Sequence, residues 1–85
     1  MAITKETYGG TTSYWKDDVV HRDDGPAIIK KNGEKYWMVN GKPHRIDGPA
    51  VLLPRDTLDA RQYWLFGIKY SYNEWRRRVK MLWLL

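Results

Sequence analysis

A nine-residue motif occurs twice in this chain and constrains its fold more than any other feature. HRDDGPAII at residues 21–29 returns as HRIDGPAVL at residues 44–52, which is 23 residues further on. A Tyr-Trp pair recurs at spacings of 22 and 27 residues, as Tyr14-Trp15, Tyr36-Trp37 and Tyr63-Trp64. Self-similarity at such a period is typical of repeat architectures, in which each copy packs on the next. Because the last copy lacks the HRxDGPA motif, we expect about two and a half repeats and a cap.

Each copy carries the signals of β-hairpins. Asn32-Gly33 and Asn40-Gly41 favour type I′ turns, because both residue types accept a positive φ. The Asp-Gly-Pro triplets at 24–26 and 47–49 predict further chain reversals. The segments between these turns are rich in aromatic and β-branched residues and predict strands at 13–16, 27–30, 35–39, 50–53 and 62–66. The sequence therefore predicts a mainly β fold, an antiparallel meander of hairpins.

The hydrophobic period changes near the C-terminus. Ser71 and Glu74 fit a capping box, with Ser71 as the N-cap and Glu74 reaching back to it. Four apolar residues then fall on one helical face, namely Trp75, Val79, Leu82 and Trp83. We expect an amphipathic α-helix at residues 71–85 that caps the meander by packing this face on the sheet.

At 85 residues the chain is expected to form one domain. We divide it into a flexible N-terminus at 1–12, the repeat meander at 13–70 and the helix at 71–85. Leu82 continues the inward face of that helix, whereas Met81, Leu84 and Leu85 are expected to point away from it. This apolar end predicts a homo-oligomer formed through the helix, docking on another protein, or cover for a sheet edge.

Composition excludes several classes of protein. The chain has no cysteine, which excludes a disulfide scaffold, a thiolate zinc site and a thiol nucleophile. Its longest apolar run covers only residues 81–85, too short for a membrane span or a signal peptide, so we expect an intracellular protein with no membrane partner. A chain of this length has a small hydrophobic core, which most of its large aromatic side chains are required to fill. We expect four tryptophans to be part of that core: Trp15, Trp37, Trp64 and Trp75.

The net charge of +5 is unevenly distributed along the chain. The positive excess falls in residues 30–45 and 69–85, while residues 1–29 are acidic. Such a field favours association with a nucleic acid or an acidic protein, although lysines beside turns also serve solubility. The candidate binding residues are ten cations: Lys30, Lys31, Lys35, Lys42, Arg45, Lys69, Arg76, Arg77, Arg78 and Lys80. Tyr36 and Tyr70, each next to a lysine, are candidates for stacking on bases.

Catalytic and metal chemistry find little support in these residues. His21 and His44 each begin a His-Arg-x-Asp pattern, and two such pairs facing one another could hold a metal ion. The simpler interpretation is structural: Asp accepts backbone hydrogen bonds at a turn, Arg pairs with that Asp, and His stacks on a tryptophan. We assign the same structural role to Gly25 and Gly48. We therefore expect no metal, no cofactor and no enzymatic activity.

The signature WxxNGxxHRxDGPA, complete from Trp37 to Ala50, resembles a MORN-like repeat of small proteins from tailed bacteriophages. The first copy departs from it, because residues 15–21 lack Asn-Gly and are one residue shorter. The third copy resembles the exit of that family into a terminal helix, and the likeness covers about residues 13–78. The resemblance implies phage origin, an all-β meander and no known active site. It also implies an accessory or counter-defence factor that binds a host nuclease, a toxin or a nucleic acid.

Charge and resemblance together give a functional hypothesis. We expect a non-enzymatic phage protein that acts in the host bacterial cytoplasm and inhibits a defence component through its basic surface. The favoured partner is a nuclease of a toxin–antitoxin system, with or without bound RNA. One alternative is an RNA- or DNA-binding accessory protein that has no protein target, and another is a structural element of the virion.

Overall fold

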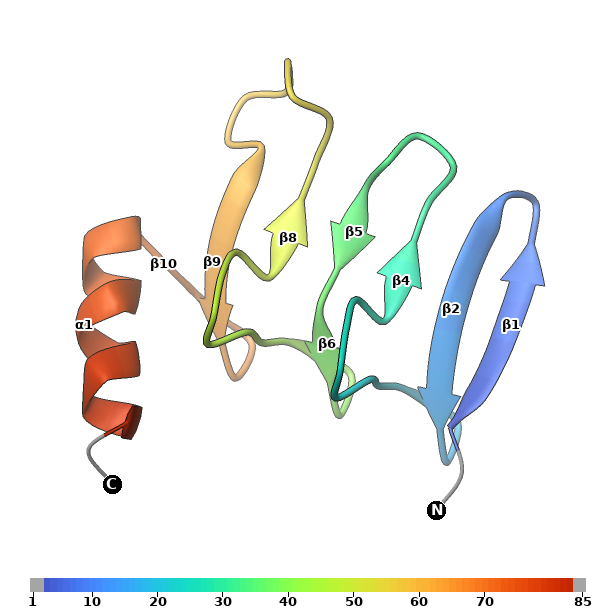
Figure 1. Cartoon of the computed structure of the whole chain (residues 1–85), viewed down its shortest axis with the longest axis horizontal. Helices are drawn as coiled ribbons and strands as arrows, with labels where there is room; N and C mark the ends of the chain where they lie inside the picture. Colours follow the sequence, from blue (N-terminus) through green and yellow to red (C-terminus); the bar gives the residue numbers. More distant parts are fainter. Residues whose placement is uncertain (1–2, 84–85) are drawn as a thin grey trace.

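The computed structural model describes residues 3–83, and its elements form an antiparallel sheet followed by one helix (Figure 1). The strands pair in the order β1-β2-β4-β5-β8-β9-β10, with β3 also paired to β2, and β6 and β7 form a separate pair. The predicted mainly β meander with a C-terminal helix is confirmed. The elements are β1 (Thr4–Tyr8), β2 (Thr11–Lys16), β3 (Val19–Val20), β4 (Ile28–Ile29), β5 (Lys35–Tyr36), β6 (Met38–Val39), β7 (Lys42–Pro43), β8 (Val51–Leu52), β9 (Arg61–Leu65), β10 (Ile68–Tyr70) and α1 (Tyr72–Trp83).

Two-residue turns close the hairpins along one edge of the sheet, at the bottom of Figure 1. Both central residues have positive φ in Asp17-Asp18, Asn40-Gly41 and Phe66-Gly67, which is the type I′ geometry. Asp17-Asp18 therefore takes the place of Asn-Gly in the first copy. The turn begins two residues after Trp15 but three residues after Trp37, so the first copy is one residue shorter, as the sequence indicates. We call this edge the turn edge, and the opposite edge, with the loops at 30–34 and 53–60, the loop edge.

The prediction of a type I′ turn at Asn32-Gly33 is wrong. Only Gly33 has a positive φ there, and its N–H donates to the Lys30 carbonyl at 3.0 Å. The Lys30 N–H in turn donates to the Glu34 carbonyl at 2.8 Å. This is a type I turn followed by a left-handed glycine, the arrangement used by slightly longer hairpin loops. The longer loop gives Lys31 and Asn32 exposed positions at the loop edge.

The three Tyr-Trp pairs are not equivalent in space. Register pairs link a row of residues whose side chains share one face, in the order Ser13, Ile28, Tyr36, Val51 and Gln62. By alternation Trp15 and Trp64 lie on that same face, while Tyr14, Trp37 and Tyr63 lie on the other. We call the first the open face and the second the covered face. The Tyr-Trp pair of the second copy is thus shifted by one residue along its strand relative to the other two pairs. Such a shift moves each side chain of the pair to the opposite face of the sheet.

The N-terminus departs from the prediction that residues 1–12 are flexible. Thr4–Tyr8 forms β1, and its five residues pair with β2. Gly9 and Gly10 both have positive φ and close this hairpin. Glycine accepts that geometry without a steric cost, and the threonines and tyrosine on either side favour strands. Residues 1 and 2 of the predicted flexible segment lie outside the described residues.

The helix covers the end of the sheet at β9 and β10 (Figure 1). It begins as predicted after Ser71, whose Oγ accepts a hydrogen bond from the Glu74 N–H at 3.2 Å. Trp75 and Val79 are buried against Leu65, and Tyr63 and Tyr70 pack around them. No helix among residues 3–83 is long and apolar enough to cross a membrane.

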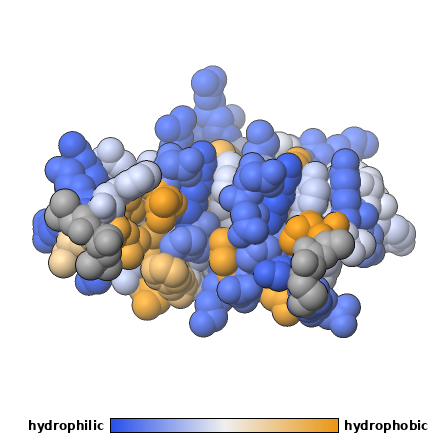
Figure 2. Space-filling view, turned by 60° about the horizontal axis from the view of Figure 1, so that its bottom comes forward, coloured by the Kyte–Doolittle hydropathy of each residue, from blue (hydrophilic) through white to orange (hydrophobic). Residues whose placement is uncertain are grey.

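The last turn of the helix is exposed, although Leu82 and Trp83 were predicted to continue the buried face. Trp83 is 72% exposed and Met81 is 64% exposed. The core cluster offers Leu65, Tyr63 and Tyr70 as partners, and these cover only the part of the helix around Trp75 and Val79. Figure 2, turned to show the turn edge, has hydrophobic residues beside the C-terminal end of the chain. Leu84 and Leu85, for which we predicted outward positions, lie outside the described residues.

Candidate anion-binding surface

The first HRxDGPA motif folds into a clamp around its own arginine. The Nε of Arg22 donates to Asp24 Oδ1 at 3.0 Å, and Nη1 donates to the Pro26 carbonyl at 3.1 Å. The guanidinium lies 4.0 Å from the centroid of the Tyr14 ring on the covered face. Gly25 leaves room for the guanidinium, because a Cβ there would lie 3.1 Å from Arg22 Cζ.

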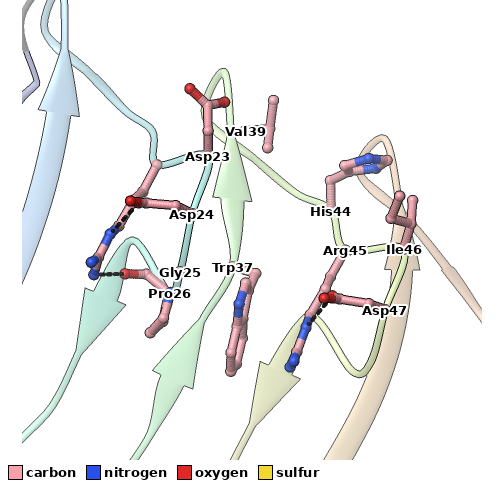
Figure 3. Close-up of a pocket in the computed structure, with 11 residues that line it drawn as sticks. Asp23, Asp24, Gly25, Pro26, Trp37, Val39, His44, Arg45, Ile46 and Asp47 are labelled. Atoms are coloured by element: carbon pink, nitrogen blue, oxygen red, sulfur yellow. Dashed lines mark hydrogen bonds and ion pairs between the residues drawn. The ribbon is translucent and has the colours of Figure 1, made fainter.

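The second motif repeats this clamp closely, as Figure 3 shows on either side of Trp37. Arg45 Nε donates to Asp47 Oδ1 at 2.8 Å, and Nη1 donates to the Pro49 carbonyl at 3.1 Å. Its guanidinium lies 3.9 Å from the Trp37 ring, and a Cβ on Gly48 would come within 2.7 Å of Arg45 Cζ. We predicted that Arg45 binds an anionic partner. Two of the five N–H donors of Arg45 are thus used by its own repeat.

The histidines join one repeat to the next. Nδ1 of His21 accepts the Asn40 N–H at 2.9 Å, and Nδ1 of His44 accepts the Phe66 N–H at 3.0 Å. An imidazole nitrogen that accepts is unprotonated, so both rings are neutral in this arrangement. Nε2 of His21 then donates to Asp23 Oδ1 at 2.9 Å. Each histidine thus holds the type I′ turn of the following repeat.

Burial lowers the pKa of His44, because removing water from the ring disfavours its charged form. Its ring lies 4.2 Å from that of Phe66, where we had expected a histidine to stack on a tryptophan. Among residues 3–83 no group of three His, Asp or Glu side chains is placed to hold a metal ion. The geometry therefore assigns the two His-Arg-x-Asp segments to joining repeats.

Several of the predicted cations are paired with acids. Lys30 lies 3.6 Å from Glu34, and Lys69 pairs with Asp59. On the helix, Arg77 and Arg78 share Glu74, at 3.2 and 3.0 Å. Arg76 and Lys80 have no ion pair within the described residues, so the arginine triplet is divided between paired and unpaired side chains.

The two tyrosines predicted to stack on bases are also occupied. Tyr36 donates its hydroxyl to Glu34 at 2.6 Å, and the Lys30 ammonium lies 5.4 Å from the Tyr36 ring centroid. This hydrogen bond raises the pKa of Tyr36 to about 12 and, with that from Asn32, lowers the pKa of Glu34. The Tyr70 ring lies under the Arg78 guanidinium at 4.6 Å. Neither ring therefore offers both faces to a ligand.

The predicted cations do not form one patch. Lys30, Lys31 and Lys35 lie at the loop edge, the helical cations lie at the end of the sheet, and Lys42 lies at the turn edge. The stem of Lys42 packs over the turn of the next repeat, since a Cβ on Gly67 would lie 3.2 Å from its Cδ. The single basic surface predicted from the sequence is therefore divided among three parts of the molecule.

One pocket at the loop edge gathers cations from separate segments of the chain. Lys35, Arg55 and Arg61 line it, together with apolar residues that include Leu52 and Leu53. No acidic residue is among its lining residues, and none of the three cations has an ion pair within the described part of the chain. We call this site the basic pocket.

The sheet register explains how the basic pocket forms. Lys35 pairs with Leu52, and Leu52 pairs with Arg61, so both cations stand on the covered face with one strand between them. Two strand spacings separate their backbones by roughly 10 Å, a gap that two long side chains can close. The Leu53 N–H donates to the Ala60 carbonyl at 2.8 Å and closes the loop that carries Arg55. Sequence reasoning missed Arg55 and Arg61 because their segment has no net positive charge.

The two long edges differ in charge. The loop edge carries six cations, Lys30, Lys31, Lys35, Arg55, Arg61 and Lys69, against three acids, Glu34, Asp56 and Asp59. The turn edge carries five acids, Asp17, Asp18, Asp23, Asp24 and Asp47, of which Asp24 and Asp47 pair with Arg22 and Arg45, and it also carries Lys42. Anions are therefore attracted more strongly to the loop edge than to the turn edge.

Comparison of the chain with protein-family models, with curated proteins and with solved structures finds no match.

Proposed function

We propose that this chain is a non-enzymatic bacteriophage protein that inhibits a host defence component in the bacterial cytoplasm by binding an anionic group. The observation that supports it is the basic pocket. Within residues 3–83 an acid lies beside six of the cations, whereas Lys35, Arg55 and Arg61 lie together without one. Like charges gathered in this way repel one another until an anion arrives, so the pocket favours a bound anion.

The mechanism is occlusion of the partner's working surface. Guanidinium groups donate two parallel hydrogen bonds to a phosphate or a carboxylate, and Arg55 and Arg61 supply two such groups. Lys35 and Arg61 stand on paired strands, so little ordering of the backbone opposes binding. Arg76 and Lys80 on the helix extend the cationic surface at one end of the sheet.

The favoured partner is a nuclease of a toxin–antitoxin system, with its RNA bound. This target class follows from the resemblance to small phage proteins of the counter-defence kind. The phosphates of a bound RNA are anions that guanidinium groups bind through two parallel hydrogen bonds. Contact with the RNA and with the nuclease together would keep the enzyme from its other substrates.

Capture from bacterial cells tests the proposal. The full chain, tagged and expressed in bacteria, is recovered after treatment with added nuclease and a high-salt wash, beside the Arg61→Glu variant. A matched control is Lys42→Glu, which makes the same charge change at the turn edge. We expect one host protein to be retained by the wild type and by Lys42→Glu and lost by Arg61→Glu. Retention of that protein by all three chains, or by none, would contradict the proposal.

A stand-alone nucleic-acid-binding protein is the second candidate, because the basic pocket fits a phosphate as well as a carboxylate. It predicts binding to bare RNA or DNA that weakens by about 0.7–0.9 log units per decade of salt for each phosphate contacted. Recovery of nucleic acid alone, all of it lost after nuclease treatment, favours this candidate over the inhibitor.

A further inference from the structure

We propose that the open face of the sheet binds the open face of a second copy of this chain, so that the protein is a face-to-face dimer. The two faces of the sheet differ in their cover. On the covered face, Arg22 lies over Tyr14, Arg45 lies over Trp37, and α1 packs on Tyr63. The open face has no second layer among residues 3–83.

The open face is apolar and belongs to all the repeats. Its side chains line a shallow groove that crosses β4, β5, β8 and β9. The large apolar residues among them are Ile28, Tyr36, Met38, Leu53 and Trp64, each only partly buried. A sheet stabilises a domain by packing each apolar face on another layer, and here one layer is missing. In a sandwich of two sheets that layer lies about 10 Å away.

Three rings on this face are fixed by hydrogen bonds within their own strand or loop. Trp15 Nε1 donates to Ser13 Oγ at 2.9 Å, and Trp64 Nε1 donates to Gln62 Oε1 at 3.1 Å. The Tyr36 hydroxyl donates to Glu34 in the same way, two residues back. A polar group that is already satisfied in the monomer needs no water when the face is covered. The rings are therefore ready to be buried without an unpaired donor.

The chain exposes more area than an ordinary monomer of its mass, and the excess is close to the area that each partner buries in a stable interface. The molecule measures 37 × 36 × 16 Å and exposes 6198 Å². A monomer of its 10.1 kDa mass ordinarily exposes about 5,300 Å², so the excess is about 900 Å². A standard stable interface buries about 800 Å² on each partner. In the described part of the chain no large side chain is fully buried, as expected when half of a core is supplied by a partner.

Charge permits two copies to meet on this face in spite of the net charge of +5. The lysines at its border are paired, Lys30 with Glu34 and Lys69 with Asp59. By register Lys35 and Arg61, which have no acid partner, point to the covered face. Two copies joined by their open faces would therefore keep both basic pockets outside the interface, and the dimer is independent of the proposed function.

Sedimentation equilibrium of the full chain tests the dimer. We expect the wild type to have twice the 10.1 kDa mass of one chain. Ile28→Lys and Met38→Lys place a charge on the open face, and each should raise the dissociation constant by about a hundredfold or more, since a two-fold interface contains every substitution twice. The matched control is Trp83→Lys on the helix, which is 72% exposed and tests association through α1.

The outcomes separate the two surfaces. Dimers of the wild type and of Trp83→Lys, together with monomers of the open-face variants, support the proposal. A monomeric wild type, or a dimer that only Trp83→Lys dissociates, overturns it. A second measurement needs no variant, because the melting temperature of a dimer rises with protein concentration. A melting temperature that does not change with concentration contradicts the proposal.

Discussion

Arg45 shows how each residue of the HRxDGPA motif depends on the others. Its guanidinium lies between the Trp37 ring and the loop that carries Asp47 and Gly48. A glycine stands at position 48 because the guanidinium of Arg45 occupies the space that a Cβ would take. Backbone geometry is not the reason, since the φ of Gly48 is not positive. Ala50 follows with no exposed surface, so no larger side chain fits at the end of the motif without moving its neighbours.

Gly48→Ala tests this packing. We expect the substitution to lower the free energy of unfolding by about 1–3 kcal/mol, the usual cost of overpacking. Gly25→Ala is the graded control, because its Cβ would lie 3.1 Å from Arg22 Cζ, whereas that of Gly48 would lie 2.7 Å from Arg45 Cζ. Urea unfolding of both variants measures the difference. A Gly48→Ala protein as stable as the wild type, or more stable than Gly25→Ala, would show that the clamp does not hold the loop.

The burial of His44 makes stability depend on pH. Burial lowers the pKa of His44 in the folded protein, so the unfolded chain binds protons first as the pH falls below about 6.5. Stability should therefore decrease as the pH falls from about 7.5 to 5.5, and His44→Ala should reduce this dependence. Urea midpoints across that range provide the measurement. The pKa of Glu34 is lowered from its ordinary value of 4.5, so Glu34 changes the stability only at a pH below this window. A wild type that gains stability toward pH 5.5 would contradict this account.

At the scale of elements, the type I′ turns fix where each repeat folds back. Asn40-Gly41 is the preferred pair for this geometry, whereas Asp17-Asp18 adopts it with φ of 50° and 64°. Non-glycine residues in the left-handed region carry a steric cost, and two neighbouring acids add repulsion. The first turn is therefore less favourable than the second.

Replacing Asp17-Asp18 by Asn-Gly should stabilise the protein. We expect a gain of about 0.5–1 kcal/mol, because the strain and the repulsion are both relieved. The melting temperature by circular dichroism measures it, with the exposed Asp56→Asn in the 53–60 loop as a control for the change in charge. A lower melting temperature for the Asn-Gly variant would mean that the two aspartates stabilise this turn.

Local signals were sufficient to predict some elements and insufficient for others. Asn40-Gly41 and the Ser71 cap were predictable because turn and cap geometry depend on adjacent residues. The face of the sheet on which each Tyr and Trp side chain lies was not predictable, since a shift of one residue in the repeat leaves the local composition unchanged. The strand at 4–8 was missed because its residues are all exposed and offer no apolar alternation.

The candidate site was only partly predictable for a similar reason. Lys35 was expected from its charged segment, but its neighbours Arg55 and Arg61 come from a segment of balanced charge and meet it only through the pairing of β5, β8 and β9. The sequence also does not reveal that the guanidinium of Arg45 folds back on its own loop. The sequence thus identifies cations, and the sheet register decides which of them remain unpaired.

At the scale of the whole molecule, the flat sheet separates its surfaces. The covered face carries the clamps and the helix, the open face is apolar, and the loop edge carries the basic pocket. Repeat units of this kind act as scaffolds, so their function is expected in side chains that the scaffold does not use. Lys35, Arg55 and Arg61 are such side chains.

The affinity of the captured partner for a variant without the basic pocket tests this account most directly. Lys35→Glu, Arg55→Glu and Arg61→Glu are combined in one chain, and Lys5→Glu, Lys16→Glu and Lys42→Glu are combined in a control with the same change of charge. We expect the first to bind at least about a hundredfold more weakly than the wild type, with an unchanged melting temperature, because charged contacts are individually strong. The control should bind much as the wild type does. Equal losses in both variants, or none in the first, would contradict the claim that the unpaired cations of the basic pocket form the binding site.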